Sequence, residues 1–190
     1  IIETYLPANC IRSNGGIDDF SFPHINITGN GILKLPKEVL LPQRAGVSSK
    51  VTITSIGCMA FTHCGGLTFL DLSQCTGLIT IGDSAFDSCP VLETVKLPES
   101  LTIIEPCAFQ GCKKLKNINF PENLKSIGAN AFKKCVKLGS TSNLSVREFT
   151  KDPGIKDGII TLPSGLESIG ELAFFCLLLP FFSVGFLISF

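Results

Sequence analysis

The chain has no tryptophan, one tyrosine, one methionine and two histidines among its 190 residues, and only 17% of its residues are charged. So few Trp and Tyr residues make an aromatic platform for stacking bases hard to build. The 16 Lys and Arg residues are balanced by 16 Asp and Glu residues, which leaves no cationic surplus for a phosphate backbone. With 45% hydrophobic residues, the chain has enough apolar material to form a core. These observations argue against a disordered chain and against a nucleic-acid partner.

Motifs for catalysis and for metal binding are also missing. There is no Cys-x-x-Cys pair, no Gly-x-Ser-x-Gly motif, no P-loop and no dinucleotide fingerprint. The histidines, His24 and His63, are too few to favour a triad or a metal centre. His63 stands beside Cys64, which suggests a thiol enzyme, but Cys64 is one member of a repeated set, so packing explains it better. We expect no catalytic residue, no metal and no cofactor.

The sequence does have 15 Phe and nine Cys, and many of them stand in a repeated frame. Ala-Phe occurs five times, and an Ile stands five residues before each Phe. In the first four repeats a Cys follows three residues after the Phe, and a Leu follows three residues after the Cys. A frame that recurs every 23 residues predicts a repeat architecture. The Phe positions are Phe61, Phe86, Phe109, Phe132 and Phe174, and the Cys positions are Cys64, Cys89, Cys112 and Cys135.

A second element of each repeat has the form Leu-x-x-Leu-x-Leu, in which another apolar residue can replace Leu, as Val95 does in Leu92–Leu97, and it is often followed by Pro. Its last two apolar positions lie two residues apart, which is the period of a half-buried strand. A 23-residue unit cannot bury its own apolar face, so the units must stack. We therefore predict a parallel sheet of about five rungs and a return segment of short strands and turns, without long helices. The rungs are expected at 33–35, 70–72, 95–97, 118–120 and 160–162, about 4.8 Å apart.

The combination of Leu-Pro, Ser-Ile-Gly, Ala-Phe and Cys at this period resembles the BspA-like leucine-rich repeat family. The segment from Leu124 to Cys135 carries the frame without a gap, and the resemblance extends from about Ile32 to Phe174. It implies a leucine-rich-repeat solenoid. Members of that family are typically surface or secreted proteins, and several are similar to adhesins that bind host proteins. The resemblance therefore implies an extracellular or cell-surface location and a protein ligand.

Spacing defines the expected domain organisation. Residues 1–31 are an N-terminal flank, which is either the end of a preceding repeat or a cap, and 32–174 form the solenoid. Unusually long spacings indicate insertions near 37–50 and 139–158, which we expect to be loops.

Residues 175–190 form a hydrophobic C-terminal segment. The uncharged run 172–190 has the length of a membrane span, but Pro180 and Gly185 interrupt it and no Lys or Arg flanks it. A membrane span is one interpretation of this run, and we favour a truncated or misread further repeat.

The outward side of the predicted sheet is our candidate binding surface. Strand alternation places apolar residues such as Leu70, Val95 and Ile118 inward and their neighbours outward. The repeats differ from one another at these outward positions, as expected where side chains face solvent or a partner. A Phe such as Phe69 is awkward on an open sheet unless something covers it. The alternatives are an ordinary solvated surface and a structural spacer that positions another domain. The outward set is Lys34, Phe69, Asp71, Thr94, Lys96, Asn117, Asn119 and Thr161.

The nine cysteines are expected to be mainly structural. The four Cys of the frame should form a column of small buried apolar groups, because parallel side chains on neighbouring rungs are poorly oriented for a disulfide. Four of the five cysteines outside the column are better placed to form bridges. They are Cys10, Cys58, Cys75 and Cys107.

Overall fold

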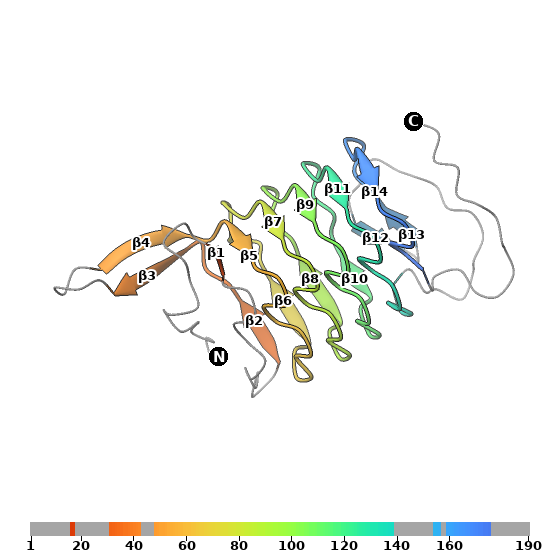
Figure 1. Ribbon diagram of the computed structural model, residues 1–190, viewed down its shortest axis with the longest axis horizontal. Helices are drawn as coiled ribbons and strands as arrows, with labels where there is room; N and C mark the ends of the chain where they lie inside the picture. The colour runs from red at the N-terminus through yellow and green to blue at the C-terminus, as the bar shows by residue number, and fades with distance from the viewer. Residues whose placement is uncertain (1–15, 18–30, 43–47, 139–153, 157–158, 176–190) are drawn as a thin grey trace, which may run out of the picture.

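The computed structural model describes residues 16–17, 31–42, 48–138, 154–156 and 159–175 (Figure 1). The described chain winds in successive coils, and two parallel sheets run along the stack as two rows of short strands (Figure 1). The described elements are all strands. The predicted class, a mainly β leucine-rich-repeat solenoid, is confirmed.

The first sheet has four strands in the order β10-β8-β6-β2, and all of its pairs are parallel. Each strand starts one residue before the predicted rung. The apolar residue at the centre of each rung is buried, and the residues on either side of it point outward. The strands are β2 (Ile32–Lys34), β6 (Phe69–Asp71), β8 (Thr94–Lys96) and β10 (Asn117–Ile118).

The second sheet is built by the predicted return segment and has six parallel strands in the order β1-β5-β7-β9-β11-β14. In each of them an Ile is paired in register with the Ile of the next coil. Gly16–Ile17, which falls in the N-terminal flank, pairs with Ser55–Ile56 and adds one rung in front of Ile32. The strands are β1 (Gly16–Ile17), β5 (Ser55–Ile56), β7 (Thr80–Ile81), β9 (Ile103–Ile104), β11 (Ser126–Ile127) and β14 (Ser168–Ile169).

A turn around each Ala-Phe pair forms a third connection between coils. The backbone N–H of Phe61 donates to the carbonyl of Ala85 at 2.7 Å, and Phe86 and Phe109 donate to the corresponding Ala of the next coil at 2.8 Å. From Phe61 to Phe132, the residues two before and two after each Phe have positive φ values, and all of them except Gly111 are not glycine. This left-handed conformation directs their amides toward the next coil, where each finds a backbone acceptor.

The interior is one continuous column of apolar side chains. Successive Phe rings stack at centroid distances of 5.1 to 5.4 Å with interplanar angles of 2° to 7°. Phe120 packs edge-on against Phe132, with centroids 5.5 Å apart. The stacking of Phe86, Phe109 and Phe132 confirms that matching positions of successive coils share one interior. Each such pair adds about 0.5 to 1.5 kcal/mol beyond the area that it buries.

The four frame cysteines form the predicted buried column. Cys89, Cys112 and Cys135 are fully buried, and Cys64 is 5% exposed. The thiol of Cys89 donates to the carbonyl of Phe61 at 3.3 Å, and Cys112 makes the same contact with Phe86. Each of these thiols therefore satisfies a backbone acceptor of the preceding coil.

The bridge assignments for the remaining cysteines find no support in the described residues. Cys75 is buried and its thiol donates to the carbonyl of Leu35 at 3.4 Å, so it is a packing residue. Cys107 is a half-buried free thiol. Cys58 is half-buried, and Cys10 lies outside the described residues.

The described parts of both insertions contain strands, which the expectation of loops did not include. β3 (Glu38–Pro42) and β4 (Ser48–Thr52) pair as an antiparallel hairpin that extends from one end of the solenoid (Figure 1). β12 (Gly154–Lys156) pairs antiparallel with β13 (Ile159–Thr161). The rung predicted at 160–162 therefore does not join the parallel sheet, because the insertion supplies β12 as its partner. In sequence the two strands are separated by Asp157-Gly158, a dipeptide typical of hairpin turns.

No helix in the described part of the chain is long and apolar enough to cross a bilayer. Most of the hydrophobic run 172–190 lies outside the described residues, so its assignment stays a prediction. Leu172 and Phe175, at its start, are exposed.

Candidate functional site

The outward face of the four-stranded sheet carries two rows of side chains that cross its strands. Register pairs Ile32 with Phe69, Phe69 with Thr94 and Thr94 with Asn117, which makes the first row. The second row is Lys34, Asp71 and Lys96, followed by Asn119 just beyond β10. Apart from Thr161, all the predicted site residues are thus gathered on one face. Thr161 lies in β13, outside this sheet, and its side chain is not described.

Phe69 is half-buried, and it is covered by a side chain of the neighbouring rung. The Lys96 Nζ lies 5.5 Å from the centroid of the Phe69 ring. An exposed cation–π contact of this kind contributes about 0.5 to 1 kcal/mol. The Lys96 side chain shields an aromatic surface that a partner could expose by displacing the ammonium group.

Asp71 lies between two lysines of its row and is ordered by Ser73. Its Oδ1 accepts hydrogen bonds from the Ser73 hydroxyl at 2.6 Å and from the Ser73 amide at 3.1 Å. Partial burial acts to raise the pKa of Asp71, but the two Ser73 bonds and the charges of Lys96 and Lys34 outweigh it, so this pKa lies below its usual value. Asp71 therefore offers a fixed negative charge in the middle of the face.

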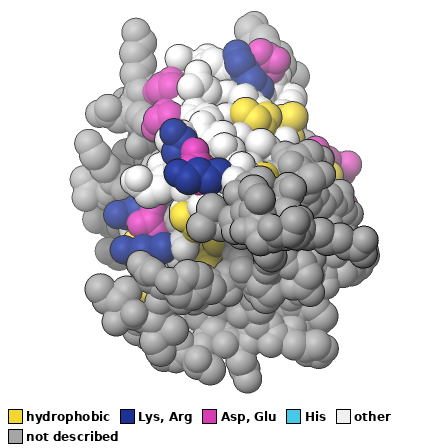
Figure 2. All heavy atoms as spheres, turned by 90° about the vertical axis from the view of Figure 1, so that its left-hand side faces the viewer, with side chains coloured by type: hydrophobic (Ala, Val, Ile, Leu, Met, Phe, Trp, Pro, Cys, Tyr) yellow, Lys and Arg dark blue, Asp and Glu magenta, His cyan; other side chains and the backbone are white. Residues whose placement is uncertain are grey.

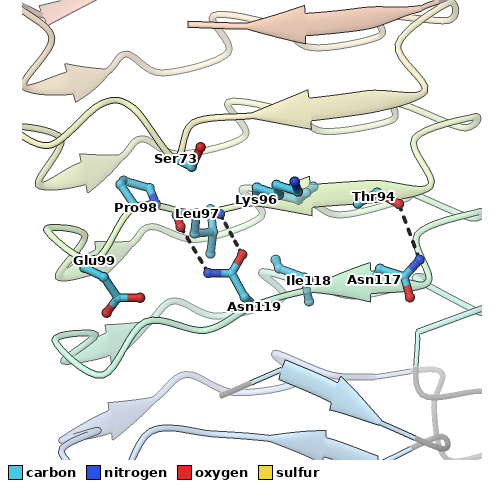
Figure 3. Close-up of a pocket in the computed structure, with 10 residues that line it drawn as sticks. Ser73, Thr94, Lys96, Leu97, Pro98, Glu99, Asn117, Ile118 and Asn119 are labelled. Atoms are coloured by element: carbon cyan, nitrogen blue, oxygen red, sulfur yellow. Dashed lines mark hydrogen bonds between the residues drawn. The ribbon is translucent and has the colours of Figure 1, made fainter. Parts of the chain in front are cut away.

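Asn119 has a structural role that alternation along the strand did not predict. Its Oδ1 accepts from the backbone amide of Leu97 at 2.9 Å, and its Nδ2 donates to the carbonyl of Leu97 at 3.0 Å (Figure 3). One rung earlier, the amide of Leu72 donates to the backbone carbonyl of Lys96. The Asn119 side chain thus replaces backbone groups where β10 ends, which gives it a structural role in addition to its place on the sheet face.

An open hollow of about 530 Å³ lies beside these rows. Asn117 lines it and donates from Nδ2 to the Thr94 hydroxyl at 3.4 Å (Figure 3). Sequence reasoning missed three further lining residues, Ser73, Pro98 and Glu99. The signal was available, because Ser73 and Pro98 directly follow predicted rungs and Glu99 comes next after Pro98, so all three lie at the same end of the sheet.

The sheet face combines one shielded aromatic ring, two lysines, one carboxylate and several neutral polar groups. His63 is exposed and its Nδ1 lies 2.9 Å from the Thr62 hydroxyl, whereas the Cys64 beside it in sequence is buried. Among the described residues, no group of three or more His, Cys, Asp or Glu side chains is placed to hold a metal ion.

Comparisons with solved structures identify similar repeat proteins. A leucine-rich repeat protein from Bacteroides ovatus has a TM-score of 0.58 and 30% identity over 84% of this chain. The leucine-rich repeat protein of T. pallidum has a TM-score of 0.56 and 29% identity over 78% of this chain. A leucine-rich cell surface protein from Faecalibacterium prausnitzii has a TM-score of 0.54 and 21% identity over 87% of this chain, so it supports the fold alone.

The chain corresponds to only part of each of these structures, covering 33%, 56% and 43% of their lengths, respectively. No curated protein sequence gave a significant match. The family model described as a BspA type leucine-rich repeat region matches residues 46–152 with six copies. This family consists of repeat modules of the protein-interaction type and is generally non-catalytic. More than half of the chain matches, and the coil geometry agrees with it, so the chain belongs to the BspA-type leucine-rich repeat family.

Proposed function

We propose that the chain is a non-catalytic protein-binding or adhesion module of a cell-surface or secreted protein, and that it binds its ligand on the outward face of the four-stranded sheet. The observation that carries this proposal is the contrast between the two sides of the strands. The inward side is apolar in every coil, whereas the outward side changes in chemical type from coil to coil through Phe69, Asp71, Thr94 and Asn117. A shared core requires repetition, and a surface that recognises one partner requires variation.

The makeup of this face supports recognition of a protein. Interfaces combine a few aromatic anchors with a polar surround. Phe69 provides such an anchor, with Asp71, Lys96 and Asn117 around it, and the open hollow offers room for a side chain of the partner. The family to which the chain belongs supports the extracellular or cell-surface location in this proposal.

The proposal can be tested with a variant of the sheet face and a matched control. The face variant combines Phe69→Ala, Asp71→Asn, Lys96→Ala and Asn117→Ala, which leaves the net charge and the structural Asn119 unchanged. The control combines Ile79→Ala, Thr80→Ala, Ser126→Ala and Ser168→Ala, which lie on or beside strands of the six-stranded sheet. Both would be measured by surface plasmon resonance against a panel of purified extracellular host proteins.

We expect the face variant to bind at least about tenfold more weakly than the parent chain, because a central aromatic anchor commonly contributes more than 1 kcal/mol. The control should bind like the parent chain. A face variant that melts as a folded protein and binds with unchanged affinity would exclude the sheet face. That outcome would favour a spacer, which tolerates these changes.

A further inference from the structure

Charge is distributed unevenly along the coils of this neutral chain. Residues 101–138 contain seven Lys and only two acidic residues, Glu105 and Glu122, whereas residues 71–100 contain five acidic residues and a single Lys, Lys96. By contrast, basic and acidic side chains stand next to one another on the end of the solenoid shown in Figure 2. The excess of positive charge is thus local to two coils.

Six of these seven lysines gather at one corner of the solenoid, which we call the lysine corner. The stack brings the two coils together, because the rings of Phe109 and Phe132 lie 5.4 Å apart and the Gly111 amide donates to the carbonyl of Lys133 at 2.7 Å. Lys114 and Lys137 each follow a column cysteine by two residues, so they occupy matching places about 4.8 Å apart along the stack. The lysine corner consists of Lys113, Lys114, Lys116, Lys133, Lys134 and Lys137.

Most of this charge is exposed, and within the described residues one of the six lysines has a carboxylate partner. Lys133 is half-buried, with its Nζ 5.8 Å from the centroid of the Phe175 ring, and the other five lysines are exposed. Lys116 lies 3.5 Å from a carboxylate oxygen of Glu93, in a pair that is open to solvent. Among the residues that the structure describes, the other members of the lysine corner make no ion pair. Like charges held this close repel one another, and a bound polyanion would relieve that repulsion.

From this arrangement we propose that the lysine corner binds a linear sulfated polysaccharide. Each lysine presents a mobile point charge, which suits sulfate groups along a flexible chain and does not require a fixed fork of donors. The segment Lys113-Lys114-Leu115-Lys116 is a short lysine-rich run of the kind found in polyanion-binding patches. The corner spans two coils, and the ring in contact with it, that of Phe175 beside Lys133, is a single ring and not a row on which successive bases could stack, so a slim charged chain fits it better than a nucleic acid.

The lysine corner is distinct from the rows of the sheet face, so this proposal does not depend on the proposed function. The probe is a size-defined heparin oligosaccharide, with binding to the full chain measured by titration calorimetry at about 50 and about 200 mM NaCl. The test variant combines Lys113→Gln, Lys114→Gln and Lys137→Gln. The control combines Lys37→Gln, Lys50→Gln and Lys125→Gln, which removes the same charge from exposed lysines outside both the lysine corner and the sheet face.

We expect the test variant to lose at least about tenfold in affinity at the lower salt concentration. The slope of its plot of log affinity against log salt concentration should also be smaller in magnitude by about two to three, because fewer counterions are released on binding. The control should bind within about twofold of the parent chain, because charges distant from the corner are largely screened.

Thermal melting of both variants would establish that each is folded, which is expected because the substituted side chains are exposed. Equal losses in the two variants would overturn the proposal, since net charge alone would then explain binding. It would also be overturned if chemically desulfated heparin bound equally well, or if duplex DNA or polyglutamate bound more tightly than heparin.

Discussion

Individual residues of this chain are constrained by the distance between neighbouring coils. Gly128 follows the Ile of its return strand, where its backbone meets that of the preceding coil. A Cβ atom at this position would lie 2.3 Å from the backbone nitrogen of Pro106 and 2.5 Å from the carbonyl carbon of Glu105. Gly82 and Gly170 occupy matching places and meet backbone atoms in the same way. These contacts give a steric reason for the Ile-Gly pair that the sequence repeats.

Replacing Gly128 with Ala is therefore expected to reduce the free energy of unfolding by about 1 to 3 kcal/mol, because backbone atoms of the neighbouring coil must move. The matched control is Gly65→Ala, where a Cβ atom would have no neighbour within 4 Å. The control should change the free energy of unfolding by no more than about 0.5 kcal/mol. Urea denaturation measures both. Equal effects of the two substitutions would contradict the close approach of the coils.

Asn119 shows how far strand alternation predicts a surface residue. Alternation correctly places its Cβ on the outward side, but it says nothing about what the amide group bonds. The strand ends at Ile118, so the Asn119 side chain turns back to the amide and carbonyl of Leu97. Asn119, which the sequence analysis placed on the binding surface, thus also bonds the backbone of the neighbouring coil where strand β10 ends. Phe69 and Lys96 were both assigned to the face, but the contact between them depends on geometry that the sequence does not specify.

At the scale of elements, several buried thiols should together lower the free energy of unfolding at high pH. The neighbouring thiols and burial raise the pKa values of Cys64, Cys89 and Cys112. Burial and the charge of Asp71 raise the pKa of Cys75 to about 12. In the unfolded chain these thiols ionise near pH 8.5. Between that pH and about 12, the folded state keeps protons that the unfolded state has lost.

Stability should therefore be fully present below about pH 8 and should fall as the pH rises toward 12, by up to about 1.4 kcal/mol per pH unit for each thiol that stays protonated. Urea denaturation at a series of pH values would measure this dependence. The Cys75→Ala variant removes one thiol, so its decline above pH 9 should be shallower than that of the parent chain. Parallel declines would show that Cys75 ionises in the folded state as readily as in the unfolded chain.

The elements that repeat could be predicted, and those that do not repeat could not. Columns such as Phe86, Phe109 and Phe132 followed from the sequence because stacked coils need the same side chain at the same place. The pairing of β12 with β13 broke the repeat. Extending the repeat pattern along the chain predicted that 160–162 would join the parallel sheet. The dipeptide Asp157-Gly158 in the sequence, however, is typical of a hairpin, and β13 pairs with β12 instead. Local turn chemistry decided the structure where the periodic pattern was interrupted.

At the scale of the whole molecule, the stack separates two kinds of information in the sequence. The interior is uniform, and that uniformity made the family recognisable from residues alone. The surface is varied, and it carries both the sheet face and the lysine corner. The sheet face was located from the sequence because alternation defines it. The lysine corner was not, because the chain is neutral overall and its lysines come together only when two coils are stacked.

The central claim is that successive coils enclose one dry interior, and thiol labelling in native buffer tests it most directly. Cys89, Cys112 and Cys135 lie inside the column, whereas Cys107 is half-buried in a turn. With a small alkylating reagent and peptide mass spectrometry, the three column thiols should react at least about a thousandfold more slowly than Cys107. Their labelling should depend on denaturant as steeply as global unfolding does. Column thiols that react as fast as Cys107 without denaturant would contradict the stacked interior.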